Sequence, residues 1–256
     1  MASKLILITG ANGVVGRLIN MFLAPYHDIV TLGGSDQLNL TDSEQVNKFF
    51  SSHPKFDIVI HCAARGTKNV NDINPSIAWS NLTMYENIKN NSRHFYKLIN
   101  LASGCELPSV PNRKETQLRT EFPINPYGMS KNIIARDVIK HLHWYNLRLF
   151  GLVSHTRVFE KVFEAAQRGD PTFPLTDRYM DYITESELER IILHYVNNDK
   201  HLINDVNMVP SVKRKVSAYI QDYIDNMGLE IKIDIIKEED DSYTGDSTNL
   251  NRSNIL

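Results

Sequence analysis

Short apolar runs alternate with longer amphipathic stretches over the first two-thirds of the chain. The apolar runs, rich in Ile, Leu and Val, predict strands at Leu5 to Thr9, Ile29 to Leu32, Ile58 to Cys62, Leu98 to Ala102 and Asn146 to Phe150. The stretches between them predict helices at Val15 to Leu23, Ser43 to Ser51, Ser76 to Asn91 and Ser130 to His143. Strands that are apolar throughout belong to sheets covered on both faces. The alternation therefore predicts an α/β fold with a doubly wound parallel sheet.

The alternation of short apolar runs and longer amphipathic stretches changes after about Gly151. Helical patterns then appear at Val158 to Arg168, Glu185 to Val196 and Val212 to Asn226, and a strand-like run follows at Glu230 to Ile236. We expect residues 1–151 to form the main domain and residues 152–256 to form mainly a small C-terminal lobe, interleaved with the last elements of the sheet. The tail from Lys237 to Leu256 is polar, with many Asp and Asn residues, which predicts a mobile segment.

Three glycines, Gly10, Gly13 and Gly16, lie between the first predicted strand and the first predicted helix. Glycine lets the backbone approach an anion closely, and a helix N-terminus offers free N–H groups and a positive dipole end. The spacing is G-x-x-G-x-x-G and differs from the standard dinucleotide pattern. A plain tight turn is the alternative, but the strand–turn–helix context favours a dinucleotide site and a Rossmann-type sheet.

Several stretches in the expected order resemble the extended short-chain dehydrogenases/reductases, the NAD-dependent epimerase/dehydratase family. The run from Thr9 to Gly16 resembles the family's glycine motif, and Asn39 to Asp42 is similar to its D-x-x-D stretch near the adenine, with Asn39 in place of the first Asp. The resemblance covers roughly residues 5 to 200 and continues through Asp57 to Ala64, Asn81, Ser103, Tyr127, Lys131 and Arg148 to Gly151.

The resemblance implies a bound nicotinamide dinucleotide. The residues it places against the cofactor are Gly10, Asn12, Gly13, Val14, Val15, Gly16, Arg17, Asn39, Leu40, Cys62, Ala63, Ala64, Tyr127 and Lys131. An acidic residue after the second strand would select NAD. That place reads Leu32-Gly33-Gly34-Ser35, with Asp36 just beyond, which leaves room for a 2′-phosphate. Arg17 would pair with that phosphate, or else it is a solvated helix residue. Because the run Gly33-Gly34-Ser35 leaves room for the phosphate, NADP(H) is favoured as the cofactor, and NAD(H) is the alternative.

Tyr127 and Lys131 are four residues apart and therefore share one helix face. A free Tyr has a pKa of about 10, and a nearby ammonium favours its phenolate. The resemblance implies that Tyr127 exchanges a proton with the reacting oxygen and that Lys131 holds the nicotinamide ribose and tunes Tyr127. Ser103 follows a predicted strand, at the sheet edge where such folds bind ligands. It would orient the substrate oxygen, or else only cap its turn.

Four further residues are candidates for contact with the substrate. Cys105 resembles a proton-transferring Cys of GDP-fucose synthases, although a small buried Cys is the simpler reading. His155 and Arg157 compete for an acid position in the segment after the strand ending at Gly151. Arg178 matches a place where relatives put a basic residue near the nucleotide diphosphate, and a guanidinium suits that anion. The alternatives are a loop histidine without such a role for His155 and an ordinary surface arginine for Arg178.

The composition excludes several classes of partner and ligand. The chain has 28 Lys and Arg against 30 Asp and Glu residues, a net charge of −2, so it has no basic surplus for nucleic acid. Its two cysteines form no disulfide framework, and no signal or membrane-spanning stretch is evident, which favours the cytoplasm. The nine histidines lack metal-ligand spacing, so we expect no metal.

The same Tyr, Lys and Ser serve several reactions in the family. Glu106 stands without the Asp partner that a dehydratase needs beside its Ser. The Asn39 to Asp42 run and the 256-residue length look most like dTDP-4-dehydrorhamnose reductases and GDP-fucose synthases. The resemblance therefore implies an NADP(H)-dependent reductase of a 4-keto nucleotide sugar in deoxysugar or surface-polysaccharide synthesis, working as a homodimer. The alternatives are an NAD-using 4-epimerase or dehydrogenase, and a non-catalytic cofactor-binding relative.

Overall fold

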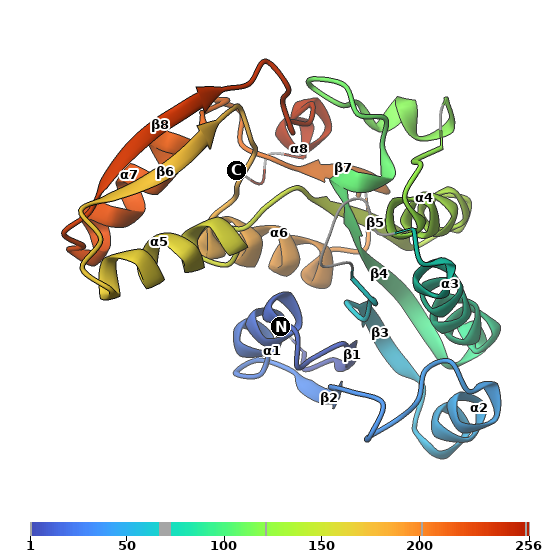
Figure 1. Cartoon of the computed structure of the whole chain (residues 1–256). Helices are drawn as coiled ribbons and strands as arrows, with labels where there is room; N and C mark the ends of the chain where they lie inside the picture. Colours follow the sequence, from blue (N-terminus) through green and yellow to red (C-terminus); the bar gives the residue numbers. More distant parts are fainter. Residues whose placement is uncertain (1, 67–72, 121, 201, 254, 256) are drawn as a thin grey trace.

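A six-stranded parallel sheet forms the centre of the computed structural model, which describes residues 2–66, 73–120, 122–200, 202–253 and 255. The strands lie in the order β2-β1-β3-β4-β5-β7 (Figure 1). Their bounds are β1 Leu5–Thr9, β2 Asp28–Leu32, β3 Phe56–His61, β4 Phe95–Ser103, β5 Trp144–Leu149 and β7 Asp205–Met208. The predicted Rossmann-type α/β fold is confirmed. Strand β7 is missed by the apolar pattern because Asp205 and Asn207 alternate with its two apolar residues.

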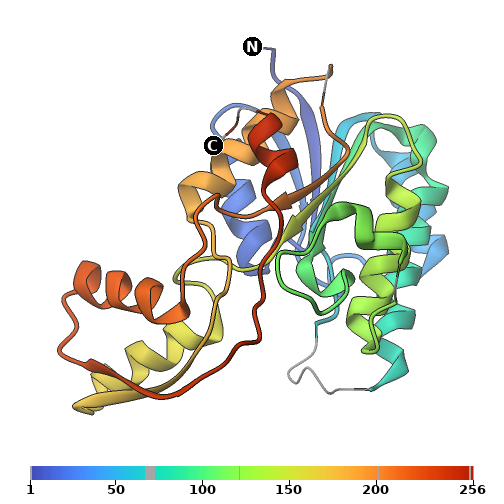
Figure 2. The same cartoon turned by 90° about the horizontal axis from the view of Figure 1, so that it is seen from above.

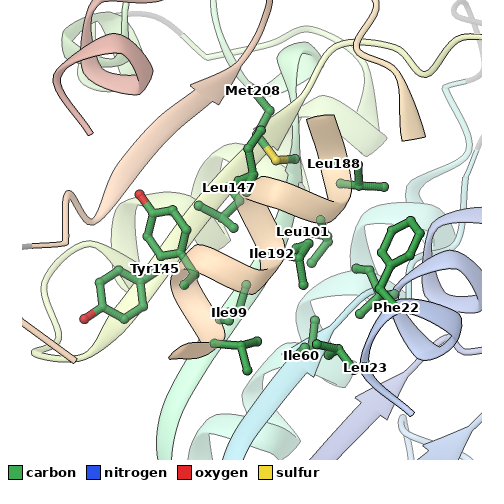
Figure 3. Packing of buried hydrophobic residues seen from close by; sticks show 14 of the residues in the cluster. Phe22, Leu23, Ile60, Ile99, Leu101, Tyr145, Leu147, Leu188, Ile192 and Met208 are labelled. Carbon is green, nitrogen blue, oxygen red and sulfur yellow. The ribbon is translucent and has the colours of Figure 1, made fainter. Parts of the chain in front are cut away.

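Helices cover both faces of the sheet. On one face, α1 (Val14–Leu23) and α6 (Glu185–Asn197) bury Phe22, Leu23, Leu188 and Ile192 against strand residues such as Leu147 (Figure 3). The other face is covered by α2 (Ser43–Ser52), α3 (Pro75–Asn90) and α4 (Pro126–Val138). This double coverage is why most residues of the strands are apolar.

Helix α4 begins earlier and ends earlier than the predicted Ser130 to His143. The Asn125 side chain accepts a hydrogen bond from Gly128 N at 2.7 Å, and Pro126 occupies the first helical position, where its missing N–H costs nothing. The helix ends at Val138, and His143 adopts a positive φ of 62° in the turn that follows. The predicted bounds are therefore wrong. The Asn125 cap starts the helix at Pro126 and places Tyr127 in its first turn.

A smaller lobe lies beside the sheet (Figure 1). It has its own apolar cluster, which includes Phe159, Leu175, Tyr219 and Ile220. Its elements are α5 (Arg157–Gln167), β6 (Thr172–Asp177), α7 (Val216–Met227) and β8 (Lys232–Glu238), with β6 and β8 paired in parallel. Between β6 and α7, the chain returns to the main sheet through α6 and β7. A domain boundary between residues 151 and 152 stays a prediction.

The prediction of a mobile tail is wrong for the described residues. Residues 239–247, which we call the strap, run from β8 back to α8 (Thr248–Arg252) beside the main sheet (Figure 2). Within the strap, Tyr243 N donates to Tyr179 O at 2.9 Å and Gly245 N donates to Asp181 Oδ2 at 2.8 Å. Leu250 of α8 is fully buried in the main core. Polar composition indicated mobility because it does not reveal these partners.

Candidate active site at the carboxyl edge of the sheet

The glycine turn leads from β1 into α1. Gly10 has a φ of +68°, and a Cβ there would lie 2.6 Å from Ala63 N. A Cβ on Gly16 would overlap the carbonyl oxygen of Gly10. Gly13 is the N-cap of α1, whose first turn has no acidic side chain and no side-chain cap. The helix N-terminus is therefore free of a competing carboxylate, which fits a bound pyrophosphate.

A pocket of about 110 Å³ opens on the β2 side of this turn. The Asn12 side chain packs over Gly33, and Asn39 Oδ1 accepts from Thr41 N at 3.1 Å, which shapes the loop around the pocket. Arg17 is exposed nearby on α1. Of the described residues, those that line the pocket include no acid; they are Gly10, Leu32, Gly33, Gly34, Ser35, Leu38, Asn39, Leu40, Ala63 and Met84.

A second pocket, of about 270 Å³, opens at the carboxyl ends of β3, β4 and β5. It brings together side chains from segments far apart in the sequence, among them eight of the predicted site residues. The lining residues are Val14, Val15, Cys62, Ala64, Leu101, Ala102, Ser103, Tyr127, Lys131, Leu149, Phe150, Gly151, Leu152, His155 and Thr156. The three predicted catalytic residues therefore share one cavity with part of the predicted cofactor set, while Gly10, Asn39, Leu40 and Ala63 line the pocket beside β2.

Tyr127 reaches this pocket because α4 packs closely on the turn after β4. A Cβ on Gly128 would overlap Cys105 O, so only glycine allows this approach. Burial raises the pKa of Tyr127 to about 12, and the Ser103 hydroxyl is the neighbour that lowers it. The phenol therefore keeps its proton at neutral pH and can donate it.

Lys131 is buried one helical turn further along α4. Its Nζ donates to Leu101 O at 2.9 Å, and burial lowers the pKa of the ammonium while Glu106 raises it. In this arrangement Ser103, rather than Lys131, is the group that opposes burial at Tyr127. The expectation that Lys131 tunes Tyr127 therefore stays a prediction.

Ser103 begins a single turn of 3-10 helix, Gly104–Glu106, that is built as a capping box. Ser103 Oγ accepts from Cys105 N at 3.3 Å, and Glu106 Oε2 accepts from Ser103 N at 3.5 Å. Glu106 is fully buried and does not line the pocket. Its carboxylate instead binds Arg148 Nε at 2.5 Å and Asn146 Nδ2 at 2.9 Å on β5. The turn that carries Ser103 is thus fixed to the neighbouring strand.

Tyr243 of the strap packs against the turn that carries Ser103. The sequence did not indicate this residue. Its Oη is 3.3 Å from Cys105 Sγ, and its ring centroid is 5.1 Å from that of Phe150. Burial raises the pKa of this phenol well above 10, and the Ser103 hydroxyl lowers it. The one available signal was an aromatic residue within an otherwise polar tail.

Of the four predicted substrate contacts, His155 lines the pocket and the other three do not. Cys105 lies on the Ser103 turn, and His155 lines the pocket with its Nε2 2.5 Å from Glu185 Oε1. Arg157 is exposed at the start of α5 and is not among the residues that line the pocket. Arg178 pairs with Asp241 at 3.1 Å and Glu239 at 3.6 Å, so acidic groups already neutralise its charge.

The described part of the chain contains neither a cluster of metal-ligating side chains nor a membrane-spanning helix. No three His, Cys, Asp or Glu side chains among these residues are grouped as ligands for a metal ion. No helix in the same part is long and apolar enough to cross a bilayer.

Comparison with known proteins gives one family match. The model of the NAD dependent epimerase/dehydratase family matches residues 6–204. A search of the curated proteins finds no match.

Solved structures with the same fold include three that contain NADP. The GDP-mannoheptose C4 reductase of Campylobacter jejuni has a TM-score of 0.80 at 18% identity, with 99% of this chain and 93% of that chain covered. The dTDP-4-dehydrorhamnose reductase of Bacillus anthracis gives 0.82 at 16% identity, with 100% and 94% covered. The GDP-L-fucose synthetase of Naegleria fowleri gives 0.74 at 18% identity, with 98% and 86% covered. At such identities the likeness establishes the fold.

Proposed function

Because the chain belongs to the NAD dependent epimerase/dehydratase family, we propose that it is an NADP(H)-dependent reductase of a 4-keto nucleotide sugar. The observation that carries the proposal is the 270 Å³ pocket, in which Val14 and Val15 at the phosphate turn face the same space as Ser103, Tyr127 and Lys131. A reductase needs this proximity, since the cofactor and the proton donor must meet at one carbonyl group.

The chain's own residues supply the proton chemistry. Bound NADPH would provide the hydride for the keto carbon. Tyr127 holds its proton at neutral pH and gives it to the oxygen of the reduced carbonyl, while the Ser103 hydroxyl donates a hydrogen bond to that oxygen and orients it. Lys131, whose Nζ donates to Leu101 O, lines the same pocket and would bind the nicotinamide ribose.

The pocket beside β2 supports NADP(H) over NAD(H). Gly33, Gly34 and Ser35 line it without an acidic side chain of their own, and the Asp36 carboxylate, which packs against Gly34, is not among the lining residues. Arg17 is exposed on α1 near this turn and would pair with that phosphate.

A nucleotide sugar is the proposed substrate, bound between the pocket and the small lobe. The nucleotide-sugar reductases among the solved structures of the same fold support this class. Cys105 and His155 would contact the sugar. Arg157 and Arg178 would contact the diphosphate, for which Arg178 must exchange its pairing with Asp241 and Glu239.

The proposed setting is cytoplasmic deoxysugar or surface-polysaccharide synthesis by a homodimer. The neighbouring helices α3 and α4 expose large apolar side chains that a second copy would cover, namely Trp79, Met129 and Ile133. Light scattering on the purified protein measures the oligomeric state directly.

The test combines the purified protein with NADPH or NADH and a panel of 4-keto sugar nucleotides made in place by a dehydratase. Substrate-dependent loss of nicotinamide absorbance with NADPH supports the reductase and identifies the nucleotide. Absence of loss with both cofactors, together with release of NAD on denaturation, favours the 4-epimerase. Absence of both turnover and bound NAD favours a non-catalytic relative.

A further inference from the structure

Two neighbouring faces of α4 have different neighbours. Tyr127 and Lys131 share the face that lines the pocket. The next face carries Gly128 and Asn132 and packs on the turn that follows Ser103. A Cβ on Gly128 would overlap this turn, so the two backbones are in close contact. The contact between this second face and the turn therefore decides where Tyr127 lies relative to Ser103.

Asn132 is fully buried on this second face and binds two backbone carbonyl groups. Its Nδ2 donates to Glu106 O at 2.7 Å and to Leu118 O at 3.0 Å. Two carbonyl acceptors require the NH2 group on this side, so the orientation of the amide is defined. Among the described residues, the 2.7 Å bond is the hydrogen bond that joins α4 to the turn Gly104–Glu106.

The amide of Asn132 leaves one of its own atoms unpaired. Its Oδ1 is buried and, within the described part of the chain, has no hydrogen-bond partner. A buried polar atom without a partner costs free energy, and an apolar side chain on a buried helix face would have no such atom. The two donated bonds are therefore what the asparagine contributes at this position.

Glu106 is held from two sides. Its carboxylate binds Arg148 and Asn146 on β5, and its carbonyl oxygen binds Asn132 on α4. Its Oε2 also accepts from Ser103 N at 3.5 Å. This one residue therefore links β5, Ser103 and α4, and Asn132 makes the link to α4.

We propose that Asn132 is a positioning residue that holds the catalytic face of α4 against the Ser103 turn. It acts through Tyr127 and Ser103, which line the same pocket. Without its two bonds the helix and the turn can separate, and a small displacement of a proton donor from the reacting oxygen slows a reaction strongly. The inference rests on the proposed function in that Tyr127 and Ser103 act on one carbonyl oxygen.

Asn132→Leu tests the proposal, since leucine fills a similar volume and donates no hydrogen bond. We expect kcat to fall about tenfold with the KM for NADPH unchanged. Asn132→Ser leaves space for water at the two carbonyl groups and should lose less, so it replaces the leucine variant if that variant fails to fold.

Asn91→Leu is the matched control and should keep wild-type kcat. Asn91 is also buried, and its Nδ2 also donates twice, to Asn47 Oδ1 at 2.7 Å and to Asn87 O at 2.8 Å. It lines neither of the two pockets beside the sheet. The control therefore measures what the loss of a buried amide does to the fold alone.

A double-mutant cycle separates positioning from a general loss of stability. In a Ser103→Ala background, Asn132→Leu should cause little further loss of kcat, because the hydroxyl that it positions is already gone. An equal loss in both backgrounds overturns the inference. A loss of the same size in Asn91→Leu, or wild-type kcat in Asn132→Leu, overturns it as well.

Hydrogen exchange keeps this inference separate from the reductase assignment. If no 4-keto sugar nucleotide is reduced, the proposed function fails, and amide exchange is measured by mass spectrometry without substrate. Asn132→Leu should then exchange faster than wild type in a peptide that covers residues 103–107, whereas Asn91→Leu should not. Unchanged exchange in Asn132→Leu, or equally fast exchange in both variants, overturns the inference in that case.

Discussion

Arg148 and Glu106 form an ion pair closed to solvent: both side chains are 0% exposed, and Nε lies 2.5 Å from Oε1. Arg148 also binds Asp205 and Asn207 of β7, each at 2.8 Å. One guanidinium therefore joins the Ser103 turn to two neighbouring strands. Asn207 Nδ2 in turn donates to Arg113 O beside the strap at 2.8 Å, so the network also reaches the segment that carries Tyr243.

Arg148→Met should strongly destabilise the protein. The substitution leaves Glu106 as a buried carboxylate without its cation, and breaking one side of a buried pair costs about 3–5 kcal/mol. The measurement is the free energy of unfolding in urea. Arg168→Met is the matched control, because Arg168 pairs with Asp170 at the surface, where such pairs are worth about 1 kcal/mol or less. Equal effects of the two substitutions would refute this account.

Tyr127→Phe should abolish most of the turnover and leave the cofactor bound. The ring still packs against the Ser103 turn, but the proton donor is lost, and such donors contribute about 100-fold or more to rate. Stopped-flow reduction and NADPH binding by fluorescence are measured on the same preparation. Tyr96→Phe, at an exposed position on β4, is the control. Normal turnover in Tyr127→Phe would rule out the catalytic assignment.

Ser35→Asp should shift the cofactor preference toward NADH. A carboxylate in the pocket beside β2 accepts from a ribose 2′-hydroxyl and repels a 2′-phosphate. We expect the Kd for NADPH to rise about tenfold, equivalent to about 1.4 kcal/mol, with that for NADH unchanged or lower. Ser35→Asn has the same shape without the charge and serves as the control. If both variants weaken NADPH equally, size rather than charge is responsible.

His61 should make the fold sensitive to mild acid. It is buried at the end of β3 with its Nδ1 2.8 Å from Thr9 Oγ1, and burial lowers its pKa from 6.5 to about 3. As the pH falls below 6.5, His61 becomes protonated in the unfolded chain. In the folded chain it stays neutral until about pH 3. The stability contributed by the neutral imidazole is therefore complete above pH 6.5 and is lost across this window, by about 2 kcal/mol at about pH 5.

The variant His61→Asn removes this titration. Its unfolding free energy should fall less than that of the wild type between about pH 7 and about pH 5, by about 2 kcal/mol. His143→Asn, at an exposed turn position whose positive φ suits Asn, controls for the loss of an imidazole. Parallel pH profiles for wild type and His61→Asn would contradict the prediction.

The sequence predicts the parts of the site that depend on local patterns. Apolar runs locate five strands of the main sheet, and parallel strands end at one edge. Ser103 and the glycine turn therefore come together with Tyr127 and Lys131 around one pocket. The prediction succeeds because each group lies next to a recognisable strand or helix.

Contacts between distant segments are not predictable in this way. The pair of Arg148 and Glu106 joins residues 42 apart, and that of Tyr243 and Cys105 joins residues 138 apart. No periodicity marks either pair. Polar residues on β7 and in the tail were interpreted by composition, which cannot separate a solvated side chain from one held in a buried network. Glu106 is the clearest case, since its buried carboxylate accepts hydrogen bonds from Ser103 N and Arg148 Nε and so fixes the Ser103 turn to β5.

The place of the strap in the chain also orders events during synthesis. A ribosome completes all six strands of the main sheet, and with them the glycine turn, before it makes residues 239–247. Every residue that lines the two pockets beside the sheet is also made before the strap, so both pockets can form without it. The strap, with its contacts to Tyr179 and Asp181, is therefore one of the last parts of the fold to be made.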